Sequence, residues 1–250
     1  MKNLPIALQM YTVREESQRD FFGTLERVAE LGIDGVELAG YGNYSVREVK
    51  NRLDQLGLQV AANHISIADL QFDLTNVITE QKILDCNYLV CPYLPQQLRT
   101  EAGYKDLIPF LEKVGKACFA EGITFCYHNH DFELNRLADG RMALDAILQS
   151  TSSNHVKAEF DIYWLAKAGE NPVEWIKRYH GRTPLVHLKD MITDEEQFFA
   201  ELGTGGVDID AVLELGDEAD VKWWIVEQDE SRLSPFESIE ISMEYLRGKV

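Results

Sequence analysis

Residues that can bind a metal ion or move a proton follow several of the short apolar runs in this sequence. Asp161, His187 and Glu227 each end a different run in the second half of the chain, and His128 ends an earlier one. Imidazole nitrogen and carboxylate oxygen are ligands that borderline and hard divalent cations prefer. If these run ends meet in space, we expect the four side chains to hold one divalent metal ion.

Each of these residues also has a simpler interpretation. A carboxylate after a strand is often the N-cap of the next helix, and a single histidine is more often hydrogen-bonded within the structure than bound to a metal. However, four of the six histidines lie at run ends, a concentration that random placement does not produce. The joint pattern therefore favours a metal site.

The apolar runs have the length and boundaries of buried strands. Each is too short for a helix and is bounded by Gly, Pro, Asn or Asp. Between them, stretches with helical apolar spacing end at or near a glycine, the expected stop of a helix. The predicted strands are 4–10, 35–38, 58–63, 88–93, 123–128, 156–161, 184–188 and 223–227, and the clearest helices are 21–31, 46–56 and 107–120.

Alternation of eight strands with helices predicts an α/β fold with a parallel sheet and helices outside it. Dividing 250 residues by eight gives roughly 31 residues per unit, the spacing of a (β/α)8 TIM barrel. A doubly wound open sheet is the competing architecture. No linker or low-complexity tract divides the chain, so we expect residues 1–250 to form one domain, with 150–154 and 190–208 as its least regular stretches.

Charge and cysteine usage limit the classes of partner. The chain has 24 Lys and Arg against 42 Asp and Glu, a formal charge of −18. That field repels polyanions, so we expect no nucleic-acid partner. No run approaches the length of a membrane span, and the N-terminus lacks the features of a signal peptide. Four cysteines without CxxC spacing predict reduced, buried thiols in a cytoplasmic protein.

The order of these segments resembles the xylose isomerase-like TIM-barrel family, a group that includes sugar phosphate isomerases and epimerases. The resemblance covers nearly the whole chain, and its motifs are specific through their order and spacing. A glycine-rich loop at 203–208 matches the family too, although such a loop alone is more often a turn than a phosphate site. The motifs are Gln9-Met10-Tyr11-Thr12-Val13-Arg14, Gly35-Val36-Glu37, Tyr127-His128-Asn129-His130-Asp131-Phe132-Glu133, Phe160-Asp161 with Trp164, Val186-His187-Leu188-Lys189-Asp190 and Val226-Glu227-Gln228-Asp229.

The resemblance implies one divalent ion (Mn, Zn, Mg or Co), held by a Glu, an Asp, a His and a Glu from the fifth to eighth strands. The last three correspond to Asp161, His187 and Glu227, whereas His128 stands at the position of the first Glu. An imidazole there removes a negative charge, which favours zinc, manganese or another metal that accepts nitrogen. It also removes one of the two carboxylates that the family's epimerases use as paired bases. Glu133 and Glu159 are the other carboxylates considered, and neither is expected to replace it; Glu159 lies deeper on the same strand face as Asp161.

Three functions fit these residues. The favoured one is a metal-dependent isomerase or epimerase of a small sugar, sugar phosphate or keto-inositol, acting through an enediolate. The second is a lyase or dehydratase on a keto-inositol or keto-glycoside, since elimination can run with one base plus an acid. The third is a sugar-binding barrel without turnover. A homodimer is compatible with such a barrel, but no sequence feature requires one.

The expected roles of the site residues follow from their chemistry. Either Glu227 is the base, or it holds the metal while His128 or His130 moves the proton, because an imidazole titrates near neutral pH. Lys189 either stabilises the developing oxyanion or pairs with Asp190. We expect the substrate's hydroxyls and ring to be bound by Gln9, Tyr11, Arg14, His64 and Trp164.

Overall fold

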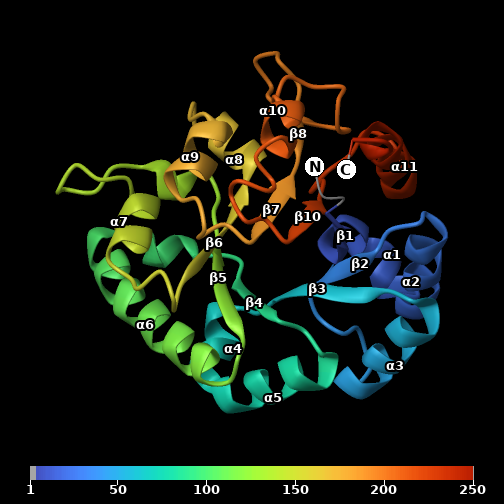
Figure 1. The fold of residues 1–250 in the computed structure, drawn as a ribbon, viewed down its shortest axis with the longest axis horizontal. Helices are drawn as coiled ribbons and strands as arrows, with labels where there is room; N and C mark the ends of the chain where they lie inside the picture. Colours follow the sequence, from blue (N-terminus) through green and yellow to red (C-terminus); the bar gives the residue numbers. More distant parts are fainter. Residues whose placement is uncertain (1–3, 250) are drawn as a thin grey trace.

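A computed structural model, which describes residues 4–249, shows eight parallel strands closed into a barrel with helices around it (Figure 1). The order around the barrel is β1-β10-β7-β6-β5-β4-β3-β2, while β8 and β9 form a separate antiparallel pair. Apart from this small pair, strands adjacent in sequence are adjacent in space. The predicted TIM barrel is confirmed, and the open doubly wound sheet is excluded.

The barrel strands coincide with the predicted apolar runs. The strand that closes the ring, β10, pairs with both β1 and β7, so the barrel has no free edge. The barrel strands are β1 Ile6–Gln9, β2 Gly35–Leu38, β3 Gln59–His64, β4 Tyr88–Cys91, β5 Thr124–His128, β6 Lys157–Asp161, β7 Leu185–Leu188 and β10 Trp223–Val226, and the outer pair is β8 Asp190–Met191 with β9 Phe199–Ala200.

The helices fill the intervals between strands. The predicted helix at 107–120 begins earlier, at Glu101, because the Thr100 side chain accepts a hydrogen bond from the amide of Gly103 and caps the first turn. The apolar spacing missed these turns because they carry mainly polar residues. The helices are α1 Arg14–Arg19, α2 Phe21–Glu30, α3 Val46–Leu56, α4 Ile67–Phe72, α5 Leu74–Leu84, α6 Glu101–Ala120, α7 Ala143–Gln149, α8 Ile162–Lys167, α9 Pro172–Arg178, α10 Ile209–Leu213 and α11 Pro235–Leu246.

Small and aliphatic side chains close the lower part of the barrel. Successive side chains on a strand point to opposite faces, so the residue two positions on points inward again, one level higher. On five strands that next inward residue is polar or charged. The pairs are Ala7 then Gln9, Ala62 then His64, Cys126 then His128, Leu185 then His187, and Ile225 then Glu227. The polar residues therefore stand on a packed floor.

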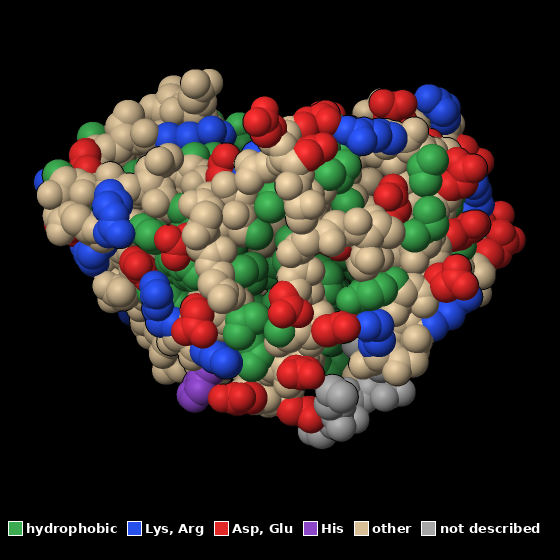
Figure 2. Space-filling model, turned by 90° about the horizontal axis from the view of Figure 1, so that it is seen from above, with side chains coloured by type: hydrophobic (Ala, Val, Ile, Leu, Met, Phe, Trp, Pro, Cys, Tyr) green, Lys and Arg blue, Asp and Glu red, His purple; other side chains and the backbone are tan. Residues whose placement is uncertain are grey.

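The surface and the cysteines agree with the composition. Figure 2 shows acidic side chains distributed across the face seen from above. All four cysteines are buried and unpaired, as predicted. Among the described residues, no helix combines the length and apolar character needed to cross a bilayer.

Candidate active site

Four side chains converge at the C-terminal end of the barrel, and they are the four predicted to bind metal. His128, Asp161 and His187 lie at the ends of β5, β6 and β7, and Glu227 follows β10. Strand register brings them together, because Asp161 is the direct partner of His187. All four are buried, and one ligand atom from each lies within 4.8 Å of the others.

We call His128, Asp161, His187 and Glu227 the metal-ligand set, because they are the candidate ligands. Each of its imidazoles turns one ring nitrogen toward a carboxylate of the same set. His187 Nδ1 lies 2.8 Å from Glu227 Oε2 and 4.0 Å from Asp161 Oδ2. His128 Nε2 lies 3.8 Å from Asp161 Oδ2. Two imidazoles and two carboxylates at this spacing are a donor set that suits zinc or manganese.

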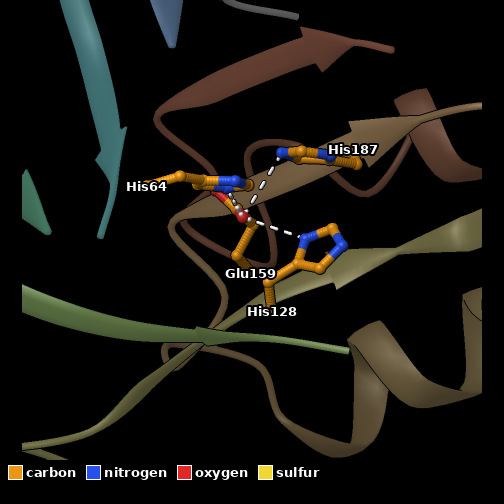
Figure 3. Close-up of side chains that lie close together, drawn as sticks. All are labelled: His64, His128, Glu159 and His187. Carbon is orange, nitrogen blue, oxygen red and sulfur yellow. Dashed lines mark hydrogen bonds and ion pairs between the residues drawn. The ribbon is translucent and has the colours of Figure 1, made fainter. Parts of the chain in front are cut away.

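The other nitrogen of each imidazole turns toward a buried glutamate one level deeper. Figure 3 shows His64, His128 and His187 gathered around Glu159. The distances to Glu159 Oε2 are 2.8 Å from His64 Nε2, 3.0 Å from His128 Nδ1 and 3.3 Å from His187 Nε2. Glu159 therefore lies below the metal-ligand set, as expected, and orients the imidazoles above it.

A second buried glutamate, Glu37 on β2, shares this role. His187 Nε2 lies 2.6 Å from Glu37 Oε2, and His64 Nε2 lies 3.1 Å from Glu37 Oε1. The Gln9 side-chain amide donates to Glu37 Oε2 at 2.7 Å. Burial raises the pKa of Glu37, but His64 and His187 together outweigh it and hold the pKa well below the usual value. Glu37 is therefore ionised and fixes the His187 ring through its far nitrogen.

The protonation of the two candidate ligand imidazoles differs. Burial, reinforced by nearby His187, lowers the pKa of His128 well below its usual value, so this ring is neutral. In the tautomer that carries its hydrogen on Nδ1, facing Glu159, the Nε2 lone pair is free to bind a cation. Burial also lowers the pKa of His187, but the nearby carboxylates of Glu159, Glu37 and Glu227 raise it by more. The net pKa of His187 therefore lies well above the usual value.

Lys189 lies at the same site. Its Nζ is 2.8 Å from Asp161 Oδ2, 2.6 Å from Glu227 Oε2 and 2.8 Å from Asp229 Oδ2. Burial lowers the pKa of Lys189, but these three carboxylates raise it more, so the buried amine stays charged. The alternative of a Lys189–Asp190 pair is wrong, because Asp190 has other partners.

Those partners are the backbone amides of the glycine-rich loop. Gly203 N and Gly205 N donate to Asp190 Oδ2 at 3.0 and 2.9 Å, and Val207 N donates to Oδ1 at 3.0 Å. A Cβ at Gly205 would lie 2.4 Å from Asp190 Oδ1, which explains the glycine there. The protein's own carboxylate occupies the position that a phosphate would need. The loop is structural, as the simpler interpretation of its sequence held.

A cavity of about 890 Å³ opens above the metal-ligand set. Its wall includes six of the residues predicted for the site, together with residues from α4, α5 and the loops after β2 and β4. The predicted six are Tyr11, His64, His128, His130, Lys189 and Glu227.

Three predicted substrate-binding residues do not line this cavity. Gln9 is fully buried beneath it. Arg14 and Trp164 line a neighbouring pocket. Arg14 donates to the backbone carbonyls of Tyr11 and Asp229, and the Trp164 indole packs against His130 from the side of that pocket.

The structure adds three carboxylates to the site that the sequence analysis did not assign a role. Glu37 and Asp229 stand in the motifs at run ends, but a carboxylate there is often a helix cap, and their contacts with His187 and Lys189 appear only in the structure. Glu159 is expected to face inward at a deeper level, and its contacts with three imidazoles likewise appear only in the structure.

Comparisons with known proteins agree with this architecture. The profile of the xylose isomerase-like TIM barrel matches residues 25–249. An inosose dehydratase from Clostridium botulinum (strain Alaska E43 / Type E3) is 27% identical and covers 93% of this chain and 90% of its own. With some other inosose dehydratases the aligned part is only 55–56% of their length.

Solved structures share the fold. A sugar phosphate isomerase/epimerase from Parabacteroides distasonis superposes with a TM-score of 0.85 at 23% identity, over 98% of both chains. The IolI protein with a bound zinc atom superposes with a TM-score of 0.77 at 16% identity, over 99% of this chain and 98% of that one. At these identities the likeness establishes the barrel alone.

Proposed function

Because the chain belongs to the xylose isomerase-like TIM-barrel family and is an enzyme, we propose that it enolises a small keto-sugar or keto-inositol. The observation that carries this proposal is the convergence of His128, Asp161, His187 and Glu227 beside Lys189 at the base of one cavity. A non-catalytic sugar-binding barrel is disfavoured, because the curated relatives named above are enzymes.

The residues present fit a divalent cation. They supply two nitrogen and two oxygen donors, buried and mutually close, with Glu37 and Glu159 behind the imidazoles. A cation held by His128, Asp161, His187 and Glu227 supplies Lewis acidity toward a ketose carbonyl and its neighbouring hydroxyl. Zinc and manganese suit the nitrogen content best, ahead of magnesium, with cobalt as a further alternative.

The chain's own residues then move the proton. Burial raises the pKa of Glu227, but Lys189 and His187 lower it by more, so the carboxylate is ionised. An ionised carboxylate can accept a proton from the carbon next to the substrate carbonyl. The Lys189 ammonium, already beside Glu227, donates a hydrogen bond to the oxygen on which charge develops. Burial and Lys189 lower the pKa of His130 to about 3, so this neutral ring on the cavity wall is suited to binding hydroxyls.

Isomerisation or epimerisation is one outcome of this enolisation. A dehydratase is the second candidate, and a specific observation supports it: the curated relatives that cover most of this chain are named inosose dehydratases. The site also has one carboxylate base, Glu227, close to a charged amine, and His128 replaces the second carboxylate. That combination is sufficient for loss of a β-hydroxyl after the proton has left.

Proton exchange with solvent tests the proposal. We expect the manganese- or zinc-loaded protein to incorporate deuterium from D₂O at one carbon next to the carbonyl of a keto-sugar or keto-inositol, followed by NMR. A new stereoisomer identifies an epimerase or isomerase, and release of water identifies a dehydratase. Absence of incorporation across a panel of ketoses and inososes, with metal bound, would contradict enolisation.

Glu37→Gln tests how the His187 ring is held. The variant keeps the shape of the side chain but removes the charge that accepts the His187 Nε2 hydrogen, so we expect metal affinity to fall by about 10–100-fold. Competition against a chelating dye measures the affinity.

Glu112→Gln is the matched control, because Glu112 forms a similar pair with a histidine, His155. His155 precedes β6 and therefore lies at the opposite end of this strand from Asp161. Equal metal affinities for Glu37→Gln and the unchanged protein would remove Glu37 from this role.

A further inference from the structure

The cavity extends well beyond the metal-ligand set. Its volume of about 890 Å³ lies near the top of the range of roughly 300–1,000 Å³ for pockets that enclose drug-sized ligands. A monosaccharide is much smaller than such a ligand. The outer wall comes from α4 and the start of α5, where Asp69, Phe72, Asp73 and Asn76 line the cavity. A sugar bound at the metal-ligand set would leave this outer part free.

Exposed aromatic side chains line the cavity. Tyr11 and Tyr93 are each 45% exposed and Phe72 is 90% exposed, and all three belong to its wall. Large aromatic surfaces left open to solvent around a concave site are typical of ligand-binding surfaces. The flat C–H face of a sugar ring packs well on such a surface. The outer part of the cavity therefore has the chemistry to hold a second ring.

The cavity offers no unpaired cation for a phosphate. Among the residues that line it, Lys189 is the single lysine and there is no arginine. The ammonium of Lys189 already contacts three carboxylates. The acidic lining residues are Asp69, Asp73, Glu80, Glu227 and Asp229. A phosphate group, which proteins bind with free Arg, Lys or backbone amides, would be repelled here.

The basic residues nearest to the cavity lie in a neighbouring pocket. It holds Arg14 and Lys167, together with acidic residues that include Glu196 and Glu230. Arg14 Nη1 donates to two backbone carbonyls, and Lys167 Nζ donates to Tyr163 Oη at 3.1 Å. Both cations keep their charge, but they belong to this adjoining pocket and do not line the cavity itself. The glycine-rich loop is closed around Asp190, so it is not an alternative phosphate site.

We infer that the substrate, if the proposed enolisation is correct, is an uncharged keto-sugar extended by a second sugar or a neutral group of similar size. The reacting ketose end lies at the metal-ligand set, and the extension lies along α4 and α5 against Phe72. The five acidic residues that line the cavity oppose a phosphate on this extension.

Three ketoses that differ only in the substituent on O6 test this inference. D-fructose, D-fructose 6-phosphate and isomaltulose carry at O6 a hydrogen, a phosphate and a glucosyl group, respectively. With metal-loaded protein, we expect isomaltulose to bind roughly two- to tenfold more tightly than D-fructose, the gain of one aromatic contact. D-fructose 6-phosphate is expected to bind most weakly, with a deficit that shrinks as salt is added. Ligand-observed NMR titrations measure all three affinities.

Phe72→Ala locates the extension. The variant is expected to bind isomaltulose roughly two- to tenfold more weakly. The difference in affinity between isomaltulose and D-fructose should therefore become smaller. Phe119→Ala is the matched control, because Phe119 is 56% exposed on α6 and does not line the cavity. It should leave the isomaltulose affinity unchanged.

The outcomes separate this inference from the proposed function. Tightest binding by D-fructose 6-phosphate, or no advantage of isomaltulose over D-fructose, overturns the inferred substrate class even if deuterium exchange at the ketose carbon occurs. The expected order of affinities without exchange in any of the three sugars supports the substrate class and counts against enolisation.

Discussion

Replacing Glu227 with Gln is expected to lower the rate of solvent deuterium exchange by at least about 10³-fold while the fold persists. A general base contributes typically 10²–10⁴-fold, and this carboxylate is also a proposed metal ligand, so both contributions are lost together. The amide has the same shape, and the Lys189 ammonium keeps Asp161 and Asp229 as partners. Circular dichroism and thermal unfolding check the fold, and dye competition gives the metal affinity.

Glu240→Gln serves as the control for this change. Glu240 is exposed on α11 and does not line the cavity, so its amide variant should retain the full exchange rate. Undiminished exchange by the Glu227→Gln protein would refute the assignment of Glu227 as base.

Replacing Lys189 with Met is expected to destabilise the metal-free protein by about 3–5 kcal/mol, the cost of removing one partner from a buried ion cluster. Without the ammonium, Asp161, Glu227 and Asp229 face one another, and their mutual repulsion and burial raise their pKa values in the folded state. A raised carboxyl pKa means that the folded state binds more protons than the unfolded chain. Stability is therefore retained at low pH and lost as the pH rises.

Urea unfolding at pH 5 and pH 8 in the presence of a chelator measures this effect, and the deficit should be larger at pH 8. Saturating manganese or zinc should restore much of the loss, because the cation supplies the missing positive charge and binds only the folded state. Lys113→Met, at an exposed position on α6, is expected to change the free energy of unfolding by less than about 0.5 kcal/mol. Equal unfolding curves for Lys189→Met and the unchanged protein would contradict the ion cluster.

The barrel and the four convergent residues were accessible from sequence for one physical reason. In a parallel barrel every strand ends at the same rim, so a residue's position in its run determines where its side chain lies. Asp161, His187 and Glu227 needed only that rule, and His128 followed from the end of the fifth run.

The remaining parts of the site depend on distances that the strand pattern does not encode. Lys189 contacts Asp229 and not Asp190, because backbone amides of the glycine-rich loop bind the Asp190 carboxylate. Arg14 follows the first strand as expected, yet backbone carbonyls hold it in the neighbouring pocket. The aromatic side chain of Phe72 belongs to a connecting segment, whose path is not fixed by strand periodicity.

The closure of the glycine-rich loop around Asp190 has a mechanical consequence for the residue next to it. Three backbone amides clamp the Asp190 carboxylate, so the main chain at Lys189 is anchored from outside the barrel as well as by β7. The ammonium can then shift between carboxylates and a bound oxygen only by side-chain rotation. Because the backbone of Lys189 is already fixed, this donor loses little conformational entropy when a ligand binds. A lysine on a mobile segment would lose more, and the ligand affinity would be lower.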